Sequence, residues 1–232
     1  MSAAASAAAR LAEKGFRRIS NTVVGDSLLG SGSFGCVYAA SVVKETGPYR
    51  VGDTVAIKEL STAGDEWQDE IKVLMNIHHP SIVRCLSFFR DEVSGRVSLV
   101  FEHCAGGDLE TFLRSRTRPI DDKVLIGWLT QLLEAVVVAD QGATHGDIAL
   151  RNVLLVKGGD DVSAVKLADF GLTEWAATEA NFRASLAPEC ADGIRKPTPA
   201  ADVWSLGLLI LQLAGLNEAI LSDELLSDQR AL

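Results

Sequence analysis

The pattern of apolar residues changes at about residue 104, and this change limits the folds that the chain can adopt. Between residues 23 and 101, apolar residues fall in short runs rich in branched and aromatic side chains, separated by glycine, proline and acidic residues. Such runs predict β-strands. After the polar stretch 102–108, apolar residues recur at helical spacing, above all along 124–137. Strands followed by helices predict an α+β protein.

We expect three regions along the 232 residues. Residues 1–22 form an Ala/Ser-rich tail, residues 23–103 a small β-rich lobe, and residues 104–232 a larger, mainly helical lobe. The tail has few acids and scattered arginines, a composition that organelle transit peptides share. A disordered or helical tail is the favoured interpretation.

The net charge of −9 argues against nucleic acid as the main partner, because proteins that bind nucleic acid usually present a basic face. A nucleotide remains compatible with this charge, since a few local basic groups suffice for a phosphate. The four cysteines lie far apart and form no CxxC pair, so we expect reduced thiols in a cytoplasmic protein. No apolar run reaches transmembrane length, so we expect no membrane segment.

Residues 145–152 form a polar stretch with two groups suited to catalysis. Asp147 supplies a carboxylate and Asn152, five residues later, a carboxamide. The apolar run 153–156 follows at once and predicts a short buried strand that would brace the polar residues. A base and a metal ligand could lie side by side here, although a surface turn before a strand explains the stretch equally well.

Three glycines, Gly30, Gly32 and Gly35, stand at GxGxxG spacing. Glycine lets the backbone approach a phosphate closely, but the pattern alone also fits a dinucleotide fingerprint or a hairpin turn. The dinucleotide fingerprint requires a helix directly after the glycines, whereas residues 36–43 read as a strand. We therefore expect a loop that joins two strands and covers a nucleotide.

Further chemistry-bearing residues stand on predicted elements. Lys58 lies on the strand 54–60, and by itself it reads as a solvated lysine. Glu70 lies on a predicted helix within residues 65–77, and Asp169 directly follows a strand that begins at Val165.

Together these stretches resemble the protein kinase catalytic domain, over roughly residues 23–214. The resemblance implies a two-lobed protein kinase-like fold that uses ATP and Mg²⁺ to phosphorylate a protein substrate. It rests on six motifs in family order: Gly30-x-Gly32-x-x-Gly35-x-Val37, Val55-Ala56-Ile57-Lys58, His145-x-Asp147 with Asn152, Asp169-Phe170-Gly171, Ala187-Pro188-Glu189, and Asp202-Val203-Trp204-Ser205-Leu206-Gly207.

The resemblance also implies a role for each site residue. Asp147 would accept or orient the proton of the attacking hydroxyl, and Lys58, paired with Glu70, would hold the α- and β-phosphates. Asn152 and Asp169 would bind magnesium through oxygen atoms. The nucleotide would be bound by a set of residues from both lobes: Leu29, Gly30, Gly32, Gly35, Val37, Ala56, Lys58, Glu102, Cys104 and Leu154.

Five residues have structural roles in the resemblance. Phe101 looks like the gatekeeper beside the adenine. Leu74, His145 and Phe170 should stack in the packing column of the active fold, and Asp202 should tie the central helix to the catalytic loop.

The chain ends earlier than the resemblance predicts. Family domains continue for several helices after the one that holds Asp202, whereas this chain stops at Leu232. We therefore expect a C-lobe without its last helices, less stable than a full domain. Glu189, which usually pairs with an arginine of the missing region, is expected to be a semi-buried carboxylate without that partner.

Three alternatives stay open for the function. An active kinase is favoured because no chemical group is missing, and the acceptor, tyrosine or serine/threonine, is unresolved. Ala149 and Arg151 lean towards tyrosine kinases, whereas residues 182–186 lack the tyrosine-kinase pattern. A pseudokinase or scaffold that binds nucleotide or partners is the second reading, supported by Gly146 and the early end. A small-molecule kinase is the third.

Gly146 yields the first prediction. The family usually has an arginine there, which pairs with a phosphate on the activation segment, and glycine cannot form this pair. Phosphorylation of Thr173, Thr178 or Ser185 is therefore expected to change the rate little. Steady-state rates of the phosphorylated and unphosphorylated protein test this, and a large gain contradicts it.

Overall fold

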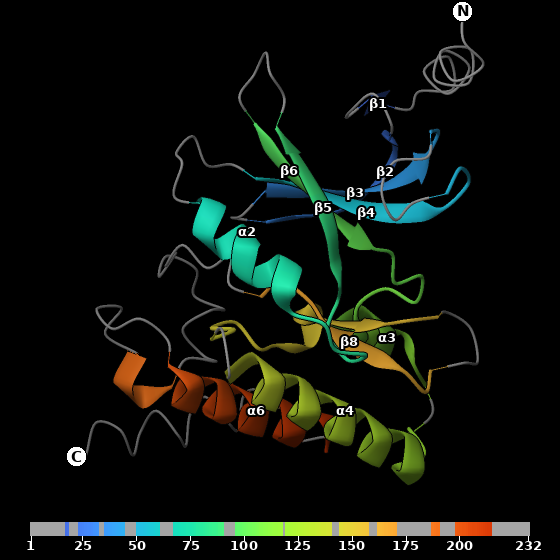
Figure 1. The fold of residues 1–232 in the computed structure, drawn as a ribbon. Helices are drawn as coiled ribbons and strands as arrows, with labels where there is room; N and C mark the ends of the chain where they lie inside the picture. The colour runs from blue at the N-terminus through green and yellow to red at the C-terminus, as the bar shows by residue number, and fades with distance from the viewer. Residues whose placement is uncertain are drawn as a thin grey trace, which may run out of the picture. The chain divides into compact units, whose positions relative to one another are not determined.

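The computed structural model describes residues 17–18, 23–32, 35–44, 50–60, 67–90, 96–117, 119–140, 144–157, 162–170, 187–190 and 198–214. They belong to two compact units, drawn in Figure 1. The first unit comprises Met1–Asn76 and Arg84–His103, and the second comprises Ile77–Val83 and Cys104–Leu232. No helix of the described residues is long and apolar enough to cross a membrane.

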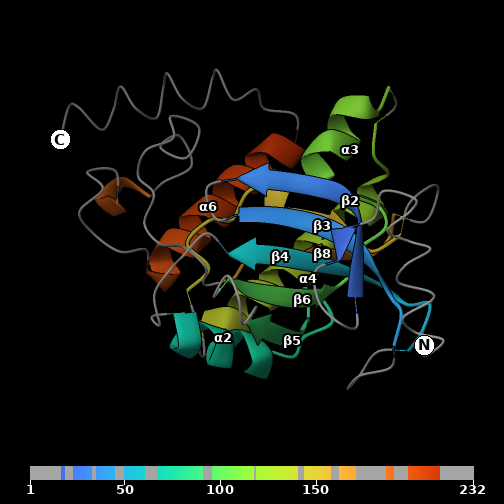
Figure 2. The ribbon, with the colours of Figure 1, turned by 90° about the horizontal axis from the view of Figure 1, so that it is seen from above.

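The first unit is built on a six-stranded antiparallel sheet with the strand order β1-β2-β3-β4-β6-β5. Figure 2 shows β2, β3, β4, β6 and β5 side by side in this order. The first strand lies in the predicted tail, and it pairs with β2. The strands are β1 (Arg17–Arg18), β2 (Val23–Gly32), β3 (Gly35–Val42), β4 (Thr54–Leu60), β5 (Cys85–Arg90) and β6 (Val97–Glu102).

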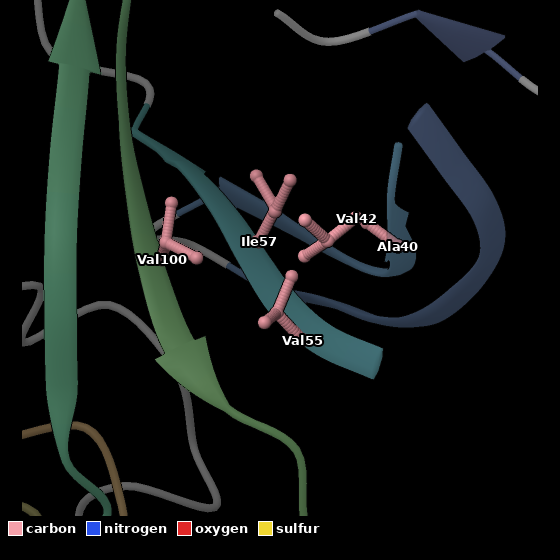
Figure 3. Close-up of a cluster of buried hydrophobic side chains, with 5 residues drawn as sticks. All are labelled: Ala40, Val42, Val55, Ile57 and Val100. Carbon is pink, nitrogen blue, oxygen red and sulfur yellow. The ribbon is translucent and has the colours of Figure 1, made fainter. Parts of the chain in front are cut away.

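One face of this sheet carries an apolar core. Side chains along a strand alternate between the two faces, so Val55 and Ile57 of β4 point to the same side. They are buried together with Ala40, Val42 and Val100 from the neighbouring strands (Figure 3). Helix α2 (Trp67–Asn76) lies beside β5 and corresponds to the helix predicted within residues 65–77.

The second unit is mainly helical. Asp108 caps α3 (Leu109–Ser115), because its Oδ1 accepts a hydrogen bond of 2.7 Å from the Thr111 amide. Thr198 caps α6 (Pro199–Leu213) in the same way. Helix α4 (Asp122–Asp140) lies alongside α6 (Figure 1). The short elements are β7 (Val153–Leu155), β8 (Val165–Leu167) and the 3₁₀ helices η1 (Leu150–Asn152) and η2 (Pro188–Cys190).

Helix α4 holds the start of β8 through side chains. The buried Trp128 donates from its indole nitrogen to the Val162 carbonyl at 2.6 Å. Gln131 donates to the Ser163 carbonyl and accepts from the Val165 amide, both at 3.0 Å. These bonds satisfy backbone groups at the start of β8 and just before it, and β8 pairs with β7 and leads to Asp169.

The predicted strand at 153–156 and the predicted helix along 124–137 are confirmed as β7 and α4. Residues 200–213 are nearly all apolar, which predicts a buried helix, and this prediction is confirmed as α6. The expectation of a semi-buried Glu189 was wrong, since its side chain is exposed. Residues 173–186 have little apolar periodicity, which predicts a mobile segment, and they lie outside the described residues.

A pair of valines in the first unit tests the core. Val55 is 2% exposed and Val51 is 62% exposed. Val55→Ala removes buried methyl groups and should lower the free energy of unfolding by about 2 kcal/mol. Val51→Ala is the matched control, with an expected change within about 0.5 kcal/mol. Urea unfolding of both variants checks this, and equal losses would contradict the assignment of the core.

Candidate functional site

The glycine-rich stretch is a β-hairpin in the first unit. Gly30 pairs with Val37 and Gly32 with Gly35 across β2 and β3. Gly35 has a φ of +129°, and a Cβ there would collide with the Glu59 carbonyl of β4. Close strand packing therefore requires Gly35 whatever the ligand. A Cβ on Gly30 would have nothing within 4 Å, so Gly30 borders open space that a ligand can approach.

Lys58 shares one face of the sheet with the predicted adenine contacts. Val37 pairs with Lys58, and Ala56 pairs with Phe101, so these four side chains lie on the face opposite Val55 and Ile57. Lys58 is only 3% exposed, which rules out the solvated lysine. Glu70 lies on α2, but its side chain is outside the described residues, so its ion pair with Lys58 stays a prediction.

Glu102 fixes the end of β6. Its carboxylate oxygen Oε1 accepts a hydrogen bond of 2.8 Å from the Arg84 amide, and its own amide donates to the Arg84 carbonyl at 3.1 Å. This double contact holds the backbone that is expected to meet the adenine edge. Leu29 lies between the paired residues Leu28 and Gly30, where the register of β2 and β3 shifts, and its side chain is exposed.

In the second unit, Asp202 binds the polar loop directly. Its two carboxylate oxygens accept hydrogen bonds from the amides of His145 at 2.7 Å and Gly146 at 2.8 Å. The predicted tie between the central helix and the loop is therefore confirmed. Gly146 has a φ of +78°, in the left-handed region that glycine adopts without strain. The glycine that departs from the family pattern thus suits the backbone of the loop.

The imidazole of His145 links the loop to the segment before Asp169. Its Nδ1 accepts a hydrogen bond from the Asp147 amide at 3.1 Å, so the ring proton is on Nε2. Nε2 donates to the Ala168 carbonyl at 2.7 Å. The ring also packs edge-on against Phe170 with centroids 4.5 Å apart, which confirms this pair of the predicted column. Leu74, the third member, is buried in the first unit.

The carboxylate of Asp147 is held by two donors. Arg151 Nη2 donates to Oδ1 at 2.5 Å, and Asn152 Nδ2 donates to Oδ2 at 2.9 Å and to the Asp147 carbonyl at 2.8 Å. The contact of Arg151 with the carboxylate was not predicted, although their i,i+4 spacing was visible in the sequence. The plane of the carboxylate is thereby set from both sides.

Asn152 and Asp169 are brought close through the backbone. The Ala168 amide donates to the Asn152 carbonyl at 2.8 Å, and Asp169 follows with a φ of +63°, rare for a residue other than glycine. Leu154 is half-buried on β7, where it forms a bridge with Asp108. Cys104 is buried in the same unit.

Known proteins are similar to this chain in sequence and in structure. The family model for protein tyrosine and serine/threonine kinases matches residues 23–222. The serine/threonine-protein kinase ATG1b of Arabidopsis thaliana is 32% identical over 84% of this chain and 28% of its own length. Mouse serine/threonine-protein kinase Nek5 is 30% identical over 84% of this chain and 31% of its own length.

A solved structure is also similar. The crystal structure of Rad53 in complex with AMP-PNP matches with a TM-score of 0.66 and 29% identity, over 81% of this chain and 46% of that chain. The chain spans less than a third of the length of ATG1b and of Nek5. Both relatives are named serine/threonine-protein kinases, whereas Ala149 and Arg151 slightly favoured a tyrosine kinase in the sequence.

His145 gives a prediction on pH. Burial lowers the pKa of its imidazole below the ordinary 6.5, and the carboxylates of Asp202, Asp147 and Asp169 oppose this only in part. The unfolded chain therefore binds the proton more readily. The contribution of His145 to stability is present above pH 6.5 and is lost as the pH falls towards the lower pKa of the folded state.

Urea unfolding between pH 7.5 and pH 5.5 is the measurement, with His145→Gln as the control because glutamine keeps an acceptor and a donor but does not titrate. The stability of the natural protein should fall more steeply than that of the variant. Parallel pH profiles would contradict the neutral His145.

Proposed function

Since this chain belongs to the protein tyrosine and serine/threonine kinase family, we propose that it is an active, ATP-dependent protein kinase with serine/threonine acceptors. The observation that carries the proposal is the orientation of Asp147, whose two oxygens are each held by a side chain. Phosphoryl transfer depends on positioning and electrostatic stabilisation more than on covalent chemistry. An oriented carboxylate can align the acceptor hydroxyl and accept its proton.

The donor atoms near Asp147 fit a magnesium ion. Both hydrogens of Asn152 Nδ2 are used on Asp147, which leaves the oxygen Oδ1 of the same amide for a cation. Together with the Asp169 carboxylate this gives hard oxygen ligands, and magnesium takes only one or two carboxylates beside substrate phosphates. Among the described residues, no group of three or more His, Cys, Asp or Glu is placed to hold a metal ion, as a zinc site would require. When bound, the ion would neutralise charge on the phosphates.

The first unit supplies groups suited to ATP. The buried Lys58 amine offers a cation for the phosphates, on the same face as the apolar Val37 and Ala56, which suit an adenine ring. Gly30 borders open space, which leaves room for the backbone there to approach the phosphates. Glu102 and Cys104 would meet the adenine edge, and Leu29 and Leu154 would cover the ring.

Two further features bear on the proposal. The serine/threonine acceptor is supported by the names of the relatives, whose activity is extended here to this chain. A cytoplasmic location is supported by the four cysteines, which are all free thiols. Burial also raises the pKa of the Cys85 thiol to about 11, so this thiol stays protonated at pH 7.

The test is transfer of labelled phosphate from ATP with magnesium to serine, threonine and tyrosine peptide libraries. Asp147→Asn and Asp169→Asn should each lower the rate at least about 100-fold, since each removes a charge that the reaction needs. Asp122→Asn, the same change at an exposed position of α4, should keep the natural rate. Equal transfer by the natural protein and all three variants would contradict the proposed kinase activity. Phosphate on tyrosine alone would contradict the proposed serine/threonine acceptor.

A further inference from the structure

The charge of the catalytic loop is unusual in its distribution. Residues 145–152 contain two basic side chains, His145 and Arg151, while Gly146 and Ala149 are uncharged. His145 is fully buried and uses both ring nitrogens in hydrogen bonds, and because Nδ1 accepts from the Asp147 amide the ring carries a single proton and no charge. Arg151 is therefore the only cation that this loop places beside the carboxylate of Asp147.

Only part of the Arg151 guanidinium is used. It forms one short contact, Nη2 to Asp147 Oδ1 at 2.5 Å, and Asp147 is its only polar partner within the described part of the chain. A guanidinium carries five N–H donors, so most of them are left for other acceptors. The Arg151 side chain is 42% exposed, whereas that of Asp147 is 10% exposed. The outer donors thus lie in solvent directly beside the carboxylate that an acceptor hydroxyl must reach.

The carboxylate can still receive a hydroxyl in this arrangement. Each oxygen of Asp147 accepts a hydrogen bond from one side chain, Arg151 or Asn152, and a carboxylate oxygen has two acceptor positions. The contact with Arg151 therefore orients the carboxylate without closing it. A peptide that brings its hydroxyl to Asp147 also brings its neighbouring side chains to within reach of the guanidinium.

We propose that Arg151 determines substrate specificity by binding an acidic side chain within two residues of the acceptor hydroxyl. The inference rests on the proposed function. A planar guanidinium matches a carboxylate with two parallel hydrogen bonds, which a basic or neutral side chain cannot form. The net charge of −9 opposes an acidic peptide only weakly at a distance, since salt screens exposed charges beyond about 8 Å. The direct contact with Arg151 therefore outweighs the long-range repulsion of an acidic peptide.

The experiment compares acceptor peptides that carry glutamate, glutamine or lysine at single positions from two before to two after the acceptor. The natural protein should prefer glutamate over glutamine at one or more positions by about fivefold in kcat/KM, the range of an exposed ion pair. Arg151→Gln should bring this ratio close to one, Arg151→Lys should keep part of it, and Arg151→Glu should reverse it in favour of lysine. The preference should shrink in high salt.

The ratio between peptides is an internal control, because a loosened Asp147 lowers the rate on every peptide alike. Arg114→Gln is the matched variant: Arg114 is an exposed arginine of α3 that pairs with Glu110, away from Asp147 in sequence. It should keep the natural ratio. Phosphate transfer with the same ratio in the natural protein and Arg151→Gln would overturn this inference and leave the kinase activity standing. A ratio lost equally in Arg114→Gln would also overturn it. Absence of transfer to every peptide would overturn the proposed function itself.

Discussion

The geometry of the second unit depends on one buried carboxylate. Asp202 is in the first turn of α6 and is almost fully buried, and it accepts hydrogen bonds from two consecutive backbone amides, those of His145 and Gly146. A buried charge is costly unless it is hydrogen-bonded. The two amide contacts therefore offset the free-energy cost of burying the Asp202 carboxylate. They fasten the polar loop at residues 145–152 to the apolar helix α6, and Gly146 allows the turn that both amides require.

His145 connects this attachment to the rest of the loop and to the segment before Asp169. Its ring accepts from the Asp147 amide on one side and donates to the Ala168 carbonyl on the other. The Ala168 amide in turn binds the Asn152 carbonyl. The backbones of the three proposed catalytic and metal-binding residues are therefore held by one small network. A site held in this way needs little rearrangement before reaction, which is the main requirement of phosphoryl transfer.

The structure alters the interpretation of two residues, Lys58 and Gly146. Taken alone, Lys58 is an ordinary strand lysine in the sequence, but its burial on the face that holds Val37 and Ala56 excludes a solvated side chain and agrees with the role that the resemblance implied. Gly146 reads as a missing arginine, yet its positive φ shows that the backbone itself favours glycine. The regulatory consequence of the lost side chain and the structural use of the glycine are separate matters.

Local physics in the sequence determined much of this protein. The apolar runs and their period predicted the strands β2 to β4 and the helix α4, and the motifs around Lys58, Asp147, Asn152 and Asp169 carried the resemblance that implied the chemistry. Within each run or motif the residues lie close together in the sequence, where backbone geometry alone relates them.

Only the tertiary structure decided which groups meet. Asp202 binds His145 across 57 residues, and Gly35 is required by the carbonyl of Glu59 on the next strand. The contact of Arg151 with Asp147 depends on a 3₁₀ turn at residues 150–152 that no apolar period announces. The contacts of Asp202 and Gly35 follow from how separate elements pack, and packing is a property of the folded chain that no short stretch of sequence contains. The contact of Arg151 is local, but the turn that brings it to Asp147 is seen only in the folded chain.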